Sequence, residues 1–273
     1  MDKVTLQGME LSLSFPDTFD FQWIGQQDVM DQLLASWLVI DDADLPLNPR
    51  LIGKPGVGKT TLAYAAAKRL SKDVYIYQCT MDTRPEDLLI TPVIDKGGGL
   101  RYVASSLVTA MIRGGVCILD EANRMSEKSW ASLAPLLDAR RYIESIVAGI
   151  KVSADKGFRI CVTMNDDAST FEIPEYIHSR LQPQIYLEFP EAEEEKRILR
   201  ENLPFVEPAI VDYVVQFLQK AHARDEDYTI RDGINIARYA AKRIQALRAT
   251  DPLPLLRESV SMTLGIEALG YAE

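Results

Sequence analysis

The sequence predicts an α/β fold in which a five-stranded parallel sheet is covered by helices on both faces and is followed by a small all-helical domain. Over the first 189 residues, five short runs rich in apolar and β-branched residues alternate with helical patterns, as is typical of parallel sheets. After residue 189 only helical spacing remains. We therefore expect a core of residues 1–189 and a helical domain of residues 190–273.

The expected strands are short, apolar and bounded by turn residues. They cover residues 50–53, 74–79, 116–121, 159–165 and 185–189. The expected helices between them cover residues 26–39, 59–70, 103–113 and 126–137. The last of these opens with Ser126, a residue type that favours the N-cap position.

The helical domain is expected to begin at Pro190. The acidic run of residues 193–195 suits the first turn of a helix and needs no functional explanation. Three more apolar patterns at helical spacing follow it, with no strand-like run among them.

The charge balance and hydropathy limit the function classes. The chain has 273 residues, and 30 basic against 40 acidic side chains give a formal net charge of −10. This charge argues against direct binding of nucleic acid. No apolar run approaches the roughly 20 residues needed to span a bilayer, and the start MDKVTLQGME lacks the features of a signal peptide. We expect a cytoplasmic protein without a membrane segment.

The cysteines and histidines form no metal-binding or catalytic pattern. Cys79, Cys117 and Cys161 each lie in an apolar, strand-like run, and no CxxC spacing is present. We expect all three to be small buried core residues. The only histidines, His178 and His222, are far apart in the sequence.

The strongest motif is GKPGVGKT at residues 53–60, a full GxxxxGK[ST] match after an expected strand and before an expected helix. In such a loop, backbone N–H groups surround phosphates, Lys59 contacts the β and γ oxygens, and the Thr60 hydroxyl is a ligand for Mg²⁺. Thr61 is expected to face the nucleotide too. The predicted nucleotide-binding residues are Gly53, Pro55, Gly56, Val57, Gly58, Lys59, Thr60 and Thr61.

Two further strands end in polar side chains at the same expected edge of the sheet. The strand at 116–121 ends in Asp120, expected to hold Mg²⁺, and Glu121, expected to orient and deprotonate the attacking water. The strand at 159–165 ends in Asn165, which suits positioning of that water. An equally good interpretation is that Asn165 starts an Asn-Asp-Asp turn and caps the next helix.

These motifs, in this order and followed by a helix with Arg180, resemble the Walker A, Walker B, sensor 1 and arginine-finger elements of AAA+ ATPases. The resemblance implies an AAA+ αβα sandwich followed by a helical lid. DEANR at 120–124 resembles the DExNR form of the MoxR, midasin, dynein-related and McrB-like group. Residues 82–102 resemble the helix-2 insert of this group, and 142–158 the hairpin before sensor 1. Glycines at 97–99 and 149 suit hairpin turns, although flexible loops have the same composition.

The resemblance also implies roles for individual arginines. Arg180 matches the finger that reaches the γ-phosphate of a neighbouring subunit, and Arg231 matches sensor 2 in the lid. Many relatives have an acid before the finger and an aromatic residue after it, where this chain has Ser179 and Leu181. The substitute candidates are Arg140, Arg141 and Arg159, and Arg124 is a further candidate for the subunit interface.

Resemblance to the MoxR-like branch implies an ATPase that uses ATP and Mg²⁺, forms a homo-oligomeric, hexameric ring, and remodels or activates a protein client, often with a von Willebrand factor A domain partner. One alternative is an McrB-like motor that works with a nuclease on DNA, which a preference for GTP favours. Another is a scaffold that binds nucleotide without hydrolysing it. The presence of Lys59, Asp120 and Glu121 argues against the scaffold.

Overall fold

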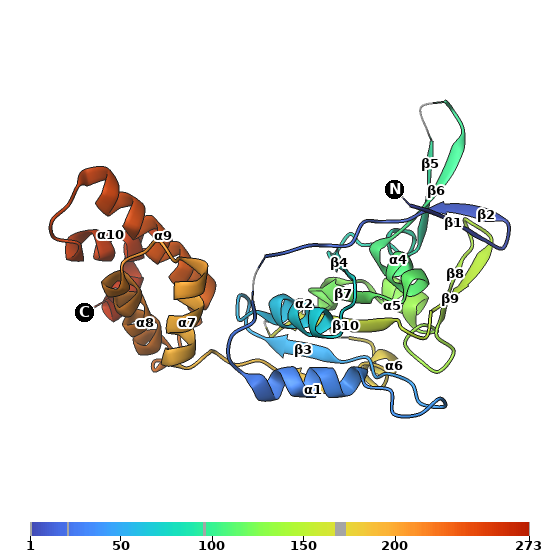
Figure 1. The fold of residues 1–273 in the computed structure, drawn as a ribbon, viewed down its shortest axis with the longest axis horizontal. Coiled ribbons are helices and arrows are strands. Elements are labelled where there is room, and N and C mark those ends of the chain that lie inside the picture. Colours follow the sequence, from blue (N-terminus) through green and yellow to red (C-terminus); the bar gives the residue numbers. More distant parts are fainter. Residues whose placement is uncertain (1, 21, 95–96, 167–172, 273) are drawn as a thin grey trace. The chain divides into compact units, whose positions relative to one another are not determined.

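The computed structural model describes residues 2–20, 22–94, 97–166 and 173–272 (Figure 1). The chain folds as two compact units, which are described here one at a time. The first unit contains the described residues of Met1–Asp20, Gln27–Gly53 and Lys59–Leu187. The second contains the described residues of Phe21–Gln26, Lys54–Gly58 and Glu188–Glu273.

A five-stranded sheet forms the centre of the first unit, in the order β11-β3-β10-β7-β4. Its strands are β3 (Arg50–Gly53), β4 (Val74–Gln78), β7 (Val116–Asp120), β10 (Arg159–Asn165) and β11 (Gln184–Tyr186). Every neighbouring pair is parallel, which confirms the predicted sheet. The prediction of a strand at 185–189 is wrong at its end, because the chain leaves the sheet after the Leu187 N–H donates to the Ile52 carbonyl at 2.8 Å.

Helices and turns connect these strands. They are α1 (Gln27–Trp37), α2 (Lys59–Arg69), α3 (Pro85–Leu88), α4 (Ser106–Arg113), η1 (Ala122–Arg124), α5 (Glu127–Leu133) and α6 (Glu175–His178). The predicted helix at 126–137 is too long. Helix α5 stops at Leu133. Its C-cap residue Ala134 still has helical backbone angles, but Pro135 has no N–H to continue the helical hydrogen bonds.

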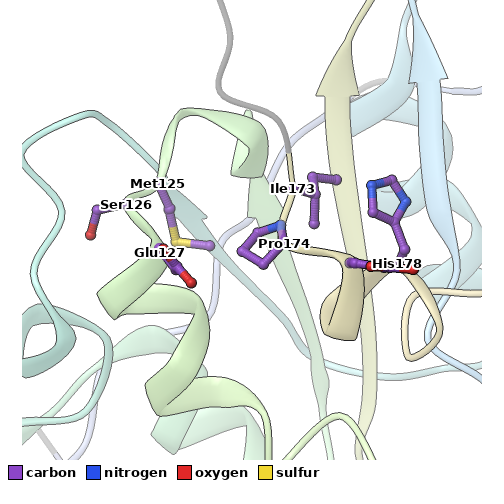
Figure 2. A pocket seen from close by; sticks show the side chains of 7 residues that line it. Met125, Ser126, Glu127, Ile173, Pro174 and His178 are labelled. Carbon is purple, nitrogen blue, oxygen red and sulfur yellow. The ribbon is translucent and has the colours of Figure 1, made fainter.

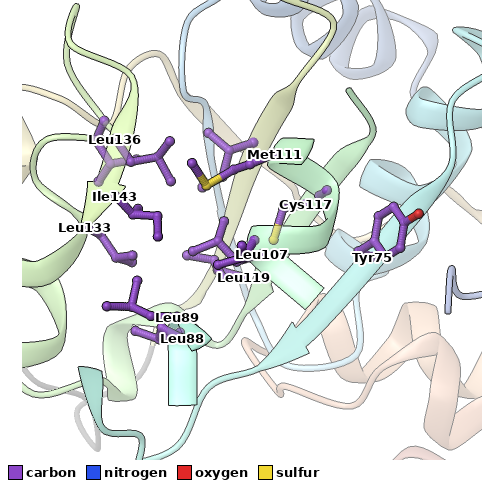
Figure 3. Close-up of a cluster of buried hydrophobic side chains, with 14 of the residues drawn as sticks. Tyr75, Leu88, Leu89, Leu107, Met111, Cys117, Leu119, Leu133, Leu136 and Ile143 are labelled. Carbon is purple, nitrogen blue, oxygen red and sulfur yellow. The ribbon is translucent and has the colours of Figure 1, made fainter. Parts of the chain in front are cut away.

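Both faces of the sheet are buried. Successive side chains of each strand point to opposite faces. On one face Leu107 and Met111 of α4 lie in the same apolar cluster as Cys117 and Leu119 of β7 (Figure 3). The alternate residues of β7, Val116 and Ile118, are also fully buried, and helix α2 packs on β7.

A second, four-stranded sheet was not predicted. It has the order β1-β2-β6-β5 and is built from β1 (Lys3–Leu6), β2 (Met9–Ser12), β5 (Ile90–Ile94) and β6 (Leu100–Ala104). Strand β6 also corrects the helix predicted at 103–113, since Val103 and Ala104 pair with β5. Helix α4 begins only after Ser105, whose hydroxyl accepts the Val108 N–H at 3.1 Å.

A separate hairpin consists of β8 (Tyr142–Ser145) and β9 (Ile150–Ser153), which are antiparallel. The turn between them contains Gly149 at φ 64°, in the left-handed region that glycine adopts without strain. Both strands lie within 142–158, where a hairpin was expected. Of the glycines at 97–99, Gly98 has φ 78°, while the neighbouring residues 95–96 lie outside the described part of the chain.

The second unit is helical. It contains α7 (Ala192–Asn202), α8 (Pro208–His222), α9 (Ile230–Leu247), α10 (Leu253–Leu264) and η2 (Ile266–Tyr271). Its described residues include no strand. A core of its own is built around Leu199, Val211, Val214 and Leu218. In neither unit do the described residues include a helix long and apolar enough to cross a membrane.

Candidate functional site

The candidate site lies where β3, β7 and β10 end. The three strands are parallel, so their carboxyl ends meet at one edge of the sheet. Asn165, the last residue of β10, is the register partner of Gly53, the last residue of β3. The next residue, Asp166, donates its N–H to the Gly53 carbonyl at 3.3 Å. The sheet therefore delivers the ends of these motifs to one place.

Helix α2 adds two polar side chains at this edge. Lys59 is buried, and its Nζ donates to the Gly53 carbonyl at 2.8 Å. The Thr60 hydroxyl donates to Asp120 Oδ1 at 2.6 Å, which joins the start of α2 to the end of β7. Thr61 follows in the first turn of α2 and is half-buried.

Thr163 is a member of the site that sequence reasoning missed. Its hydroxyl donates to Asp120 Oδ1 at 2.6 Å and accepts the Glu121 N–H at 2.9 Å. It is completely buried. The signal was available in RICVTMN, since a residue two positions before Asn165 in a strand faces the same side of the sheet.

Glu121 has both carboxylate oxygens in contact with neighbours. Asn165 Nδ2 donates to Oε1 at 3.4 Å, and Arg124 Nε lies 2.7 Å from Oε2. The backbone of Glu121 is left-handed, with φ 53°, where the chain turns from β7 into η1. Asn123 supports the arrangement by donating from Nδ2 to the Asn165 carbonyl at 3.0 Å.

Asn165 therefore faces Glu121. The alternative interpretation, a turn and helix cap after Asn165, falls on residues 167–172, which lie outside the described residues.

The oxygen atoms at this edge fit a magnesium site. Thr60 supplies a hydroxyl and Asp120 a carboxylate, and hard cations such as Mg²⁺ prefer oxygen ligands. The loop between β3 and α2 has Gly56 at φ 87° and Gly58 at φ 102°, left-handed conformations that favour glycine. Pro55 precedes Gly56 and Val57 lies between the two glycines, in the turn that follows β3.

Arg180 has its contacts outside this cluster. Its Nε lies 3.5 Å from Asp138 Oδ2, and its Nη1 donates to the Tyr176 carbonyl. Arg231, the second residue of α9, is exposed in the second unit.

The substitute arginines have different environments. Arg141 Nη2 donates to the Phe158 carbonyl at 2.9 Å, and Arg159 Nε donates to the Trp37 carbonyl at 2.7 Å. Burial lowers the pKa of both guanidinium groups from the usual arginine value. These contacts tie the two half-buried side chains to backbone carbonyls of the first unit. Arg140 is exposed and pairs with Asp138 at 2.8 Å.

The cysteine prediction is confirmed, because Cys79, Cys117 and Cys161 are free and buried. Burial raises the pKa of all three thiols, and the charge of Asp120 adds to the effect at Cys79 and Cys161. Within the described ranges, no group of three or more His, Cys, Asp and Glu residues is arranged to hold a metal. His178 Nδ1 lies 2.7 Å from Arg50 Nη1, so this nitrogen accepts from the guanidinium.

A cavity of about 670 Å³ lies beside the turn after η1 and beside α6 (Figure 2). It is lined by Met125, Ser126, Glu127, Ile173, Pro174, Glu175 and His178. None of these residues belongs to the predicted site, so this cavity is distinct from the polar cluster at the strand ends.

Comparison with known proteins agrees with this geometry. The family model described as AAA domain (dynein-related subfamily) matches residues 50–181, a range that includes β3, α2, β7, β10 and Arg180. An uncharacterized protein of Staphylococcus aureus (strain NCTC 8325 / PS 47) is 24% identical over 179 residues, covering 64% of this chain and 68% of the relative. An uncharacterized protein of Staphylococcus haemolyticus (strain JCSC1435) is 23% identical over 179 residues, again covering 64% of this chain and 68% of the relative.

Among solved structures, the Thermotoga maritima RuvB Holliday junction branch migration motor superposes with a TM-score of 0.61 at 17% identity. The match covers 90% of this chain and 72% of RuvB. At this identity the likeness concerns the fold alone. The chain has the AAA+ P-loop fold, with a five-stranded parallel sheet and a helical C-terminal region.

Proposed function

We propose that this chain, built on an AAA+ core, binds ATP with Mg²⁺ at the strand ends of its parallel sheet and hydrolyses it as one subunit of a ring. The observation that carries the proposal is the hydrogen-bonded chain Thr60–Asp120–Thr163, which connects α2, β7 and β10 through one carboxylate oxygen. These hydrogen bonds join the start of α2 to the strand end that carries Asp120 and Glu121, which supports nucleotide hydrolysis at this edge of the sheet.

Each residue has a separate proposed role. Lys59, with the loop of residues 53–58, binds the phosphates, and Thr60 and Asp120 hold Mg²⁺, which supplies charge neutralisation when bound. Glu121 is the general base for the attacking water, and Asn165, which donates to its Oε1, orients that water. The additional member Thr163 fixes Asp120 and the Glu121 backbone at once.

The proposed ring rests on the arginine finger, which a neighbouring subunit would supply to each nucleotide. Arg180 is proposed to reach the γ-phosphate of a neighbouring subunit, where an arginine stabilises the charge that develops in phosphoryl transfer. Arg231, on the helical region of residues 190–273, is proposed as sensor 2. We propose a homo-hexamer, since AAA+ proteins commonly form rings.

Within this class we propose a cytoplasmic, MoxR-like motor that remodels a protein client, with a von Willebrand factor A domain protein as candidate partner. DEANR at 120–124 and the two inserts at 82–102 and 142–158 support this branch. The net charge of −10 disfavours direct contact with DNA, although the RuvB fold neighbour is described as a branch migration motor.

Mass measured by light scattering tests the ring. Glu121→Gln is expected to bind ATP without hydrolysing it, and should assemble into a hexamer when ATP is added. Lys59→Ala, expected not to bind ATP, is the matched control and should not respond. A Glu121→Gln chain that stays monomeric with ATP saturating would contradict self-assembly through nucleotide.

A further inference from the structure

Two segments that are distant in sequence meet around Arg180. One is the segment after α5, which carries Asp138 and Arg140. The other is α6 with the turn that follows it, and these carry Tyr176 and Arg180. A buried side chain joins their backbones, since Asn48 Nδ2 donates to the Leu137 carbonyl at 2.9 Å and to the Arg180 carbonyl at 3.1 Å. The position of Arg180 relative to the segment after α5 is thus fixed.

The side chain of Arg180 is directed by Asp138. Its Nε forms an ion pair with Asp138 Oδ2 at 3.5 Å without a hydrogen bond, and its Nη1 donates to the Tyr176 carbonyl. Among the described residues, no contact of Nη2 is found. With 28% of its side chain exposed, Arg180 is partly accessible to a partner.

The charges of this cluster do not cancel. Arg140 donates to Asp138 from Nε at 3.0 Å and from Nη2 at 2.8 Å, and these bonds lower the pKa of the Asp138 carboxyl to about 2. Asp138 is therefore ionised at neutral pH and faces two guanidinium groups. One carboxylate with two cations leaves a net positive charge, which suits an anionic ligand such as a polyphosphate.

We propose that Asp138 is a positioning residue that directs Arg180 toward the nucleotide of a neighbouring subunit. This inference rests on the proposed finger in trans and deepens it. Asp138 does not touch the nucleotide. It acts through its ion pair with Nε, which limits the positions that the Arg180 side chain can take, while Asn48 fixes the Arg180 backbone through its carbonyl.

Subunit mixing tests the proposal. Asp138→Asn keeps the shape and removes the charge, and should lower kcat of the homomeric ring about tenfold, with KM little changed. A Glu121→Gln subunit lacks the base but has a positioned finger. Mixing it with Asp138→Asn should therefore raise activity above the sum of the separate variants, because intact bases then meet intact fingers.

Two mixtures separate this inference from the function beneath it. Arg180→Ala with Glu121→Gln should also gain activity, while Asp138→Asn with Arg180→Ala should not, since neither supplies a working finger. If Arg180→Ala gains activity when mixed with Glu121→Gln but Asp138→Asn does not, the role of Asp138 is overturned and the finger stays in place. No gain in either mixture with Glu121→Gln overturns the finger in trans, and the inference with it.

A measurement without nucleotide addresses the contact itself. In the NMR spectrum of the free protein, the Arg180 Nε–H resonance, assigned with Arg180→Lys, should shift in Asp138→Asn. Asp155→Asn is the matched control. The Asp155 carboxylate accepts the Gly157 N–H at 2.7 Å and forms no ion pair with Arg180, so this variant should leave the resonance unchanged. An unshifted resonance in Asp138→Asn overturns the inference.

Discussion

The Thr60 hydroxyl donates to Asp120 Oδ1 at 2.6 Å, across 60 residues of sequence. The first residue comes from the helix that follows the glycine-rich loop, and the second ends a buried strand. Together they offer the hydroxyl and carboxylate oxygens that Mg²⁺ prefers. This pair is the geometric basis of the proposed activity, and it leads to the first prediction.

Thr60→Val should lower ATP turnover about a hundredfold, because it removes both a metal ligand and the hydrogen bond to Asp120. Thr60→Ser keeps the hydroxyl and should stay within about threefold of the natural chain. Steady-state phosphate release at several Mg²⁺ concentrations measures both. Natural turnover in Thr60→Val would exclude Thr60 from the metal site.

Thr163→Val should lower turnover about tenfold, since Asp120 loses a donor and the Glu121 N–H loses its acceptor. Leaving that N–H unpaired should also cost about 1 kcal/mol of unfolding free energy. Thr163→Ser restores the hydroxyl and should recover most of both. Urea unfolding and phosphate release provide the measurements, and equal activity of the Val and Ser variants would show that the hydroxyl has no role.

Ionisation of the buried Glu195 carboxyl should lower the unfolding free energy of the helical unit as pH rises. Burial raises the pKa of its carboxyl from 4.5 to about 7, partly opposed by Gln219, which donates to Oε2 at 3.0 Å. Because the folded-state pKa lies above the unfolded value, this stabilising contribution is full below about pH 4.5 and is lost as pH rises through about 7.

At pH 8, urea unfolding of Glu195→Gln should therefore give an unfolding free energy up to about 3 kcal/mol above that of the natural chain. At pH 4.5 the two unfolding free energies should be nearly equal. The exposed Glu193 of the same helix provides the control, since Glu193→Gln should not alter the pH dependence. If Glu195→Gln shows the same pH dependence as the natural chain, the carboxyl is not titrating as described.

The three cysteines should resist thiol reagents in the folded protein. Cys79, Cys117 and Cys161 are buried, and burial raises the pKa of each thiol, so little reactive thiolate is present. Ellman's reagent should label all three in urea and none rapidly in native buffer. Fast labelling of a native thiol would show that its strand opens readily.

The sequence was sufficient for the elements whose pattern is local. Strands β3 and β10 begin and end at the predicted residues, because apolar runs closed by a glycine-rich loop and by a polar residue define both ends. The register of the parallel sheet then brought Gly53 and Asn165 together, as expected from strand ends at one edge.

Features that depend on pairing between distant segments were missed. The β1-β2-β6-β5 sheet joins residues 3–12 to residues 90–104, and such short strands carry little pattern of their own. Thr163 was overlooked because its role comes from its neighbour Asp120 on another strand. The contact of Arg180 with Asp138 is likewise set by tertiary structure, through Asn48.

ATP hydrolysis by the natural chain and by Glu121→Gln tests the central claim most directly. Phosphate release and nucleotide affinity are measured side by side, with Lys59→Ala as the variant that should not bind. We predict that the natural chain hydrolyses ATP, and that Glu121→Gln binds it with similar affinity while turnover falls at least about a hundredfold. Unchanged turnover in Glu121→Gln would contradict the assignment of Glu121 as the base.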